Sequence, residues 1–162
     1  MQNYIPRIGI GQDSHRFSDN FNKKCILAGV VFEDLPCFLA DSDGDVIFHC
    51  ICNAISSITH VPILGKVAIE LCHKDKVTDS KIYLQKALET LKSIKITHVA
   101  ITIEAKKPKL QKKINLMREN ISKIMNLDID SVGITVTSGD GLSDFARGEG
   151  VQAFCIVSSI QN

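Results

Sequence analysis

Two hydrophobic periodicities occur along this chain, and together they restrict the folds open to it. Between residues 97 and 104, Val99, Ile101 and Ile103 alternate with other residues at the period of a half-buried strand. Between residues 46 and 58, apolar residues recur at the spacing of one helix face. Because the two patterns follow one another in mixed order, the sequence predicts an α+β sandwich with a mixed sheet and helices packed on one face.

The same patterns place the individual elements. Strands are expected at residues 5–12, 26–32, 97–104, 132–136 and 151–158. Helices are expected at residues 46–58, from Asp79 or Ser80 to Leu91, and from Pro108 to Ile124. No period predicts the conformation of residues 61–79. With 162 residues and no low-complexity linker, residues 1–162 are predicted to form one domain.

Composition excludes several classes of protein. The net charge is +1, so there is no broad basic surface for nucleic acid. No apolar run approaches the roughly 18 residues that span a membrane, and residues 1–11 lack the apolar segment of a signal peptide. The six cysteines show no disulfide-scaffold spacing, so we expect reduced thiols in a cytoplasmic protein.

Two segments carry residues that suit a metal ion. Asp13 and His15 are two residues apart, so in extended chain they point to the same side, and His49, one helical turn after Asp45, is the best candidate for a third ligand. Three protein ligands leave zinc an open fourth position, as in catalytic sites. Cys52 is a rival ligand, although such a cysteine is more often a core residue. Spacing alone also permits Asp13 to cap a turn and both histidines to be ordinary hydrogen-bonded residues.

An acidic cluster precedes the helix predicted at residues 46–58. Asp41, Asp43 and Asp45 surround Gly44. Carboxylates at a helix start favour the helix dipole and can cap the first turn. The backbone N–H groups of the same helix start could instead bind a phosphate. The pattern leaves both interpretations open.

Two loops that follow predicted strands offer groups for an anionic ligand. Three lysines between residues 106 and 109 flank Pro108, and such a cluster would stabilise a diphosphate or a nucleotide. Residues 137–141, Thr-Ser-Gly-Asp-Gly, supply hydroxyl and glycine N–H groups for phosphate oxygens, and Asp140 suits Mg²⁺. The alternatives are a solvated lysine loop and a simple Gly-Asp-Gly turn.

Five motifs in this order and spacing are together specific. They are Gly9-Ile-Gly-Gln-Asp-Ser-His15 with Arg16-Phe17, Ser42-Asp-Gly-Asp-Val46 with His49, Ala105-Lys-Lys-Pro-Lys109, Thr137-Ser138, and Ala146-Arg-Gly-Glu-Gly150. Through them the chain resembles the 2-C-methyl-D-erythritol 2,4-cyclodiphosphate synthase family over nearly its whole length. The resemblance implies a ferredoxin-like or chorismate-mutase-like sandwich that forms a homotrimer with active sites between subunits. It implies a lyase of non-mevalonate isoprenoid biosynthesis that converts 4-diphosphocytidyl-2-C-methyl-D-erythritol 2-phosphate to the cyclic 2,4-diphosphate and CMP.

The resemblance also implies roles for individual residues. One Zn²⁺ per subunit would be bound by Asp13, His15 and His49, and Mg²⁺ or Mn²⁺ would accompany the diphosphate at Asp140. Catalysis would involve Asp41 and Ser138, and the trimer axis would lie near Arg147 and Glu149. The substrate would contact Asp13, Ser14, His15, Asp41, Ser42, Gly65, Ala105, Lys106, Lys107, Pro108, Lys109, Leu110, Gln111, Thr137, Ser138, Gly139, Asp140, Asp144 and Arg147.

The chain departs from the family pattern mainly where the diol phosphate would bind. Asp41 stands where the family has His, and Ile63 where it has Asp. Nearer the nucleotide, Ser138 replaces Thr, Asp140 replaces Glu, and Asp144 replaces Phe. Two alternatives to the active synthase follow. One is a catalytically impaired, zinc-stabilised nucleotide-binding trimer, and the other is a metal-dependent phosphoester hydrolase on the same scaffold.

Overall fold

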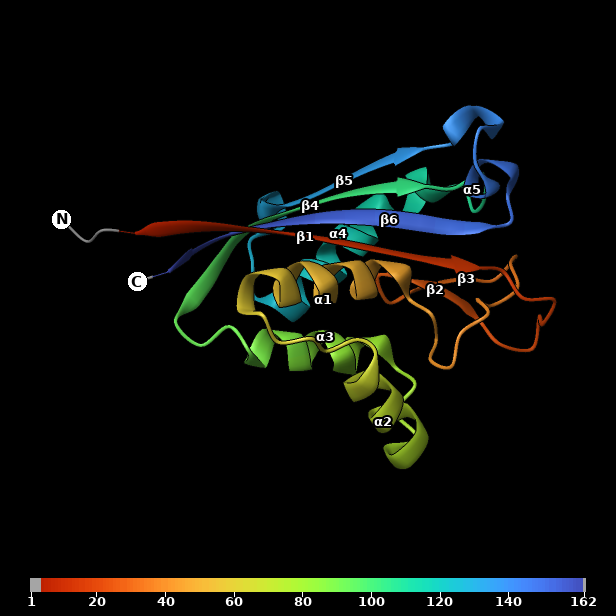
Figure 1. Ribbon diagram of the computed structural model, residues 1–162. Coiled ribbons are helices and arrows are strands. Elements are labelled where there is room, and N and C mark those ends of the chain that lie inside the picture. The colour runs from red at the N-terminus through yellow and green to blue at the C-terminus, as the bar shows by residue number, and fades with distance from the viewer. Residues whose placement is uncertain (1–3, 162) are drawn as a thin grey trace.

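A four-stranded mixed sheet forms the centre of the computed structural model, which describes residues 4–161 (Figure 1). Its strand order is β1 (Ile5–Arg16), β6 (Gly150–Gln161), β4 (Ile94–Glu104) and β5 (Val132–Thr137). Strand β6 runs antiparallel to both β1 and β4, whereas β4 and β5 are parallel. The predicted α+β class with a mixed sheet is therefore confirmed.

Helices cover one face of this sheet (Figure 1). The covering helices are α1 (Val46–Thr59), α3 (Ser80–Glu89) and α4 (Ile114–Met125), whereas α2 (Lys66–Asp75) lies farther from the sheet and the short α5 (Asp144–Arg147) lies at its end, just before β6. Helix α1 lies along β1 and β6, α3 packs against α1, and α2 projects away from the sheet (Figure 1). Short 3-10 helices occur at Leu110–Lys113, Ile129–Ser131 and Gly139–Gly141. Within residues 4–161, no helix is both long and apolar enough to cross a membrane.

Glycines in β1 allow α1 to lie directly against the sheet. A Cβ atom on Gly9 would lie 2.1 Å from the carbonyl oxygen of Ala54, and one on Gly11 would lie 2.0 Å from that of Cys50. No side chain larger than hydrogen fits at these distances. The close approach of strand and helix brings residues 13 and 15 of the strand near the first turn of the helix.

The cysteines lie mostly in the apolar core. All six are free thiols, and only Cys72 among them is partly exposed. Burial raises the pKa of the Cys25 thiol to about 12, with smaller contributions from the charges of Asp45 and Cys37. Cys52 is fully buried in the core and does not join the metal-ligating residues described below.

The strand predicted at residues 26–32 is wrong as a single element. It is a hairpin of β2 (Cys25–Leu27) and β3 (Val30–Phe32). Ala28 and Gly29 form its turn with φ values of 52° and 70°, and their N–H groups both donate to the carboxylate of Asp45. Asp45, which is distant in the sequence, therefore stabilises the turn. The local pattern of apolar residues cannot predict such a contact.

Three further boundaries differ from the prediction. Strand β1 extends beyond residue 12, so Asp13 to His15 lie within it and pair with residues 151–153 of β6. Residues 61–79, for which no period was found, contain α2. The helix predicted to start at Pro108 begins later, because the backbone is still extended at Lys109 and α4 starts only at Ile114.

Candidate metal centre and its neighbouring pockets

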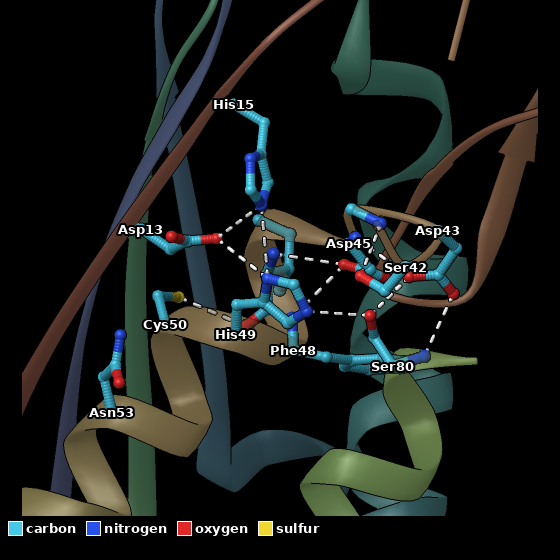
Figure 2. A network of polar contacts seen from close by, with 12 residues as sticks. Asp13, His15, Ser42, Asp43, Asp45, Phe48, His49, Cys50, Asn53 and Ser80 are labelled. Atoms are coloured by element: carbon cyan, nitrogen blue, oxygen red, sulfur yellow. Dashed lines mark hydrogen bonds and ion pairs between the residues drawn. The ribbon is translucent and has the colours of Figure 1, made fainter. Parts of the chain in front are cut away.

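Three side chains from β1 and α1 converge on one point (Figure 2). Asp13 and His15 project from the same side of β1, and His49 comes from the first turns of α1. Asp13 Oδ2 lies 3.0 Å from His49 Nδ1 and 3.2 Å from His15 Nε2, and the two imidazole nitrogens are 3.3 Å apart. Asp13 and His15 are partly buried and His49 is buried.

These spacings fit a tetrahedral metal ion. Zinc with nitrogen and oxygen ligands near 2.0–2.1 Å places neighbouring ligand atoms about 3.3 Å apart. Burial alone would raise the pKa of Asp13, but the hydrogen bonds and charges of His15 and His49 outweigh it and lower the pKa to about 2. The carboxylate is therefore ionised over the whole physiological range, as a metal ligand must be.

Asp45 sets the position of His49 by capping α1. Its side chain is completely buried and accepts hydrogen bonds from the N–H groups of Ala28, Gly29, Ile47 and Phe48. Burial, together with the charge of Asp43, raises the pKa of this carboxyl to about 7, while bonds from Gly29, Ala28 and Phe48 act in the opposite direction. Within the acidic cluster, capping is therefore the role of Asp45.

Asp43 and Ser80 form a polar contact on the other edge of the His49 ring. The Ser80 hydroxyl lies 2.9 Å from His49 Nε2 and also hydrogen-bonds Asp43 Oδ1. The Ser80 N–H donates to Asp43 Oδ2 over 3.1 Å. Sequence reasoning missed both residues as part of the site, because the contact joins the start of α3 to the loop before α1 and no local pattern indicates it.

A pocket of about 520 Å³ opens beside the three ligating side chains. Its walls come from β1, the loop before α1, and helix α2 with the residues before it. The predicted site residues that line it are Asp13, His15, Asp41, Ser42, His49 and Gly65. The lining residues that sequence reasoning missed are Leu39, Ala40, Leu64, Ala68, Ile69, Cys72 and Tyr83. Most of these missed residues are apolar, so no charged or hydrogen-bonding group marks them as site residues in the sequence.

The two departures from the family pattern at the predicted diol-phosphate end, Asp41 and Ile63, differ in position. The Asp41 side chain is 74% exposed at the rim of the pocket, and its Oδ2 lies 3.9 Å from His73 Nε2 of α2. Ile63 is only 5% exposed and packs in the apolar core instead of lining the pocket. An imidazole therefore stands next to the acidic residue at position 41, whereas position 63 has become part of the packing.

A second, smaller pocket of about 240 Å³ lies at the ends of β4 and β5. Its lining contains eight of the predicted substrate-binding residues: Ala105, Lys106, Pro108, Lys109, Leu110, Gln111, Thr137 and Ser138. Glu104 supports the adjoining turn, because its carboxylate hydrogen-bonds Ser143 and lies where a Cβ on Gly139 would be. Asp140 follows in this turn at φ 50°, and Ser138 Oγ donates to its Oδ1 over 3.3 Å.

The remaining predicted residues lie around the ends of β1 and β6. Lys107 does not line the second pocket, and its Nζ lies 5.4 Å from the centre of the Phe17 ring. Arg147 and Arg16 both pair with Asp144, and Arg16 also pairs with Glu149. Ser14 joins this charged group in a small pocket with His15, Arg16, Asp144, Phe145 and Glu149.

The pocket beside the ligating side chains and the pocket at the ends of β4 and β5 are separate in a single chain. They share no lining residue. Asp13 and His15 are on β1, and residues of β5 line part of the second pocket. Strands β1 and β5 are the two edge strands of the sheet. The structure therefore brings Asp13, His15 and His49 together. It also brings the lysine loop next to residues 137–138. Within one chain, these two clusters remain apart.

Fold and site together define an α+β protein with three side chains that could hold a metal ion at the wall of an open pocket. The chain belongs to the YgbB family, whose model matches residues 6–160. It is 57% identical to a curated protein of Chlamydia abortus over 160 residues, which are 98% of this chain and 91% of that protein. That relative is named 2-C-methyl-D-erythritol 2,4-cyclodiphosphate synthase.

Solved structures agree with this family. The bifunctional IspDF of Campylobacter jejuni superposes with a TM-score of 0.89 at 25% identity, covering 99% of this chain and 43% of that longer protein. A 2C-methyl-D-erythritol-2,4-cyclodiphosphate synthase in a CDP-bound form superposes with a TM-score of 0.76 at 26% identity, covering 93% of this chain and 98% of that one. The similarity thus extends over nearly the whole fold described here.

Proposed function

We propose that this chain, as a single domain of residues 1–162, converts 4-diphosphocytidyl-2-C-methyl-D-erythritol 2-phosphate to 2-C-methyl-D-erythritol 2,4-cyclodiphosphate and CMP. The observation that carries the proposal is the Asp13, His15 and His49 centre at an open pocket, in a chain 57% identical to a curated synthase. The identity to a curated synthase over nearly the whole chain favours the active enzyme over a zinc-stabilised binding protein that has lost turnover.

The metal proposed for the centre is Zn²⁺. One carboxylate and two imidazoles are a common zinc donor set, and three protein ligands leave room for a substrate oxygen. When bound, zinc would supply Lewis-acid charge at a phosphate oxygen. Asp13, His15 and His49 would hold the zinc ion at a fixed point of the pocket wall. Ser42 and Gly65 line the space next to it.

The cytidine diphosphate end of the substrate is assigned to the second pocket. Lys106 and Lys109 line it and offer positive charge, and the hydroxyls of Thr137 and Ser138 can donate to phosphate oxygens. Asp140, adjoining this pocket, would hold Mg²⁺ or Mn²⁺, which would supply positive charge near the diphosphate. The CDP-bound synthase with 26% identity is consistent with a ligand of this class.

The chemistry requires positioning more than a protein nucleophile. The substrate's 2-phosphate oxygen forms a bond to the β-phosphorus, and the bond from that phosphorus to the bridging oxygen breaks, so CMP leaves with the electron pair. Such phosphoryl transfer depends on alignment and charge neutralisation. Ser138 would donate to a phosphate oxygen. Asp41 would act at the diol-phosphate end, where its pairing with His73 places an imidazole beside the carboxylate.

We propose a homotrimer in which a neighbouring copy joins the two pockets. A substrate with both a diol phosphate and a cytidine needs groups from each pocket, and one chain keeps them apart. The face of β1 and β6 opposite the helices also exposes Ile8, Ile10, Phe154 and Ile156, with exposures of 42–72%. Contiguous apolar surface of this kind is typical of a protein interface. Arg147 and Glu149 would lie near the axis.

A cytoplasmic location is also proposed. It rests on the six free thiols, which suit a reducing compartment. Fractionation of cells that produce the tagged protein would measure it.

The test is a ³¹P NMR time course with the cytidine diphosphate methylerythritol 2-phosphate substrate, Zn²⁺ and Mg²⁺, repeated after chelation. The synthase gives CMP and a cyclic diphosphate that require metal. A zinc-stabilised binding trimer would bind nucleotide and leave the spectrum unchanged. A phosphoester hydrolase would release inorganic phosphate or an uncyclised phosphate, and either of these results would reject the proposal.

A further inference from the structure

The edge of the His49 ring that faces away from the other ligands contacts a buried hydroxyl group (Figure 2). His49 Nε2 lies 2.9 Å from Ser80 Oγ, and the Ser80 side chain has no exposed surface. The same hydroxyl hydrogen-bonds Asp43 Oδ1. A continuous polar chain therefore runs from a carboxylate through a hydroxyl to the imidazole ring of a metal ligand.

The number of available protons determines which group donates in each hydrogen bond between Asp43, Ser80 and His49. The Asp43 carboxylate accepts N–H groups from Asp45 and from Ser80, each over 3.1 Å. An ionised carboxylate has only acceptors, and a hydroxyl has one proton to donate. If Ser80 donates that proton to Asp43, it accepts from His49 Nε2–H. If it donated to His49 instead, the buried Ser80 oxygen would face a partly buried Asp43 oxygen without a proton between them, which is costly.

The direction of these hydrogen bonds determines which ring nitrogen of His49 carries the proton. With its proton on Nε2, neutral His49 presents the lone pair of Nδ1, which lies 3.0 Å from Asp13 Oδ2. In the neutral ring this lone pair and the carboxylate repel unless a positive charge lies between them, and the contact is a hydrogen bond to Asp13 only when Nδ1 also carries a proton. We propose that Asp43 and Ser80 are positioning residues that hold His49 in the Nε2–H tautomer and thereby prepare Nδ1 to bind the cation.

This inference deepens the proposed function and rests on it only for the presence of a metal. Hydrogen-bond partners behind a metal-binding histidine fix its tautomer and orient its ring, and their removal commonly costs about 10–100-fold in metal affinity. Ser80 is the first residue of α3, and Asp43 belongs to the loop before α1. The packing of the start of α3 against the loop before α1 therefore affects how strongly His49 of α1 binds a metal ion.

The first experiment measures the affinity for Zn²⁺ alone, without substrate, by competition with a chromophoric chelator. Ser80→Ala and Asp43→Asn are each expected to weaken zinc binding about 10–100-fold. Ser56→Ala is the matched control, because the Ser56 hydroxyl oxygen is also buried but has no hydrogen-bond partner within residues 4–161. Since no turnover is measured, the result stays distinct from success or failure of the synthase assay.

The second experiment reads the tautomer directly from ¹⁵N-imidazole NMR. The metal-free wild type is expected to carry its His49 ring proton on Nε2. In Asp43→Asn the new amide can donate to Ser80, which turns the hydroxyl proton toward Nε2 and favours a proton on Nδ1. A wild-type spectrum with the proton on Nδ1 would overturn the inference, even if Ser80→Ala failed to fold. Folded variants that bind zinc within about twofold of wild type would overturn it too.

Discussion

The pocket beside the metal ligands has two walls of different construction. On the ligand side, α1 buries ten of its residues and is capped by Asp45 through two N–H groups of its own first turn. On the opposite side, α2 has no buried residue, and Gly65 before it makes no side-chain capping bond. One wall is therefore fixed by the core of the protein, and the other is held by few contacts.

This difference separates two requirements of the site. Metal ligands tolerate little movement, because donor atoms must stay within a few tenths of an ångström of the ideal distances. A substrate wall can shift and still exclude water, and elements with few buried contacts open most readily. We therefore expect changes on the α1 side to affect metal binding and stability, and changes on the α2 side to affect substrate binding and rate.

The largest effect is expected from His49→Ala. It removes one of the three proposed ligands and should abolish both zinc binding and turnover while the proposed trimer survives. Zinc content by atomic absorption, with size-exclusion chromatography, measures this. His98→Ala is the control, because it removes an exposed imidazole from β4 outside the site. Normal zinc stoichiometry in His49→Ala would refute the ligand assignment.

Asp45→Ala should destabilise the fold by about 3 kcal/mol, since a lost helix cap and unpaired buried N–H groups each cost about 1–2 kcal/mol. Urea denaturation monitored by circular dichroism measures the change. Asp79→Ala removes an exposed cap with one N–H partner, at the start of α3, and should cost about 1 kcal/mol. Equal effects of the two substitutions would contradict the central role given to Asp45.

Zinc affinity should fall as the pH is lowered, because imidazoles bind a metal ion only in their unprotonated form and protons compete with the metal. Asp13 is not the cause, because its pKa is lowered from 3.8 to about 2. A lowered carboxyl pKa stabilises the folded state above pH 3.8, and that contribution disappears as the pH falls through about 2. Competition titrations from pH 8 to pH 4 measure the zinc affinity, and an affinity that stays constant throughout would contradict the prediction.

On the exposed rim, Asp41→His should raise kcat severalfold with unchanged zinc affinity. The substitution replaces negative charge beside phosphates with an imidazole, and Asp41 lies outside the ligand set. Steady-state kinetics measure the rate. A decrease of tenfold or more would show that this protein has built its site around the aspartate and its contact with His73.

The smallest effect is expected from Gly65→Ala in the α2 wall. Gly65 has φ +87° and no atom within 4 Å of an added Cβ, so the cost is backbone strain of about 1–3 kcal/mol without a clash. The start of α2 should shift, raising KM modestly and leaving zinc affinity intact. Kinetics and chelator competition on one preparation test both parts, and a loss of zinc binding would show that the two walls are coupled.

The sequence by itself determined the elements with strong periodicity and the residue types of the metal site. The helix at residues 46–58, the strand at 97–104 and the pairing of Asp13 with His15 follow from local spacing, which depends on neighbours along the chain. The motif order also led to the family, since five short matches at fixed intervals are improbable in unrelated chains.

Tertiary structure alone decided how those parts meet. The turn at Ala28 depends on a carboxylate at Asp45, and the tautomer of His49 depends on Ser80 and Asp43. These contacts join residues 17 to 37 positions apart, so no local pattern reports them. Position 63 shows the same limit, because its side chain packs in the core and its residue type says nothing of which way it points. Spacing along the chain fixes a local conformation, and only packing fixes which distant groups come within bonding distance.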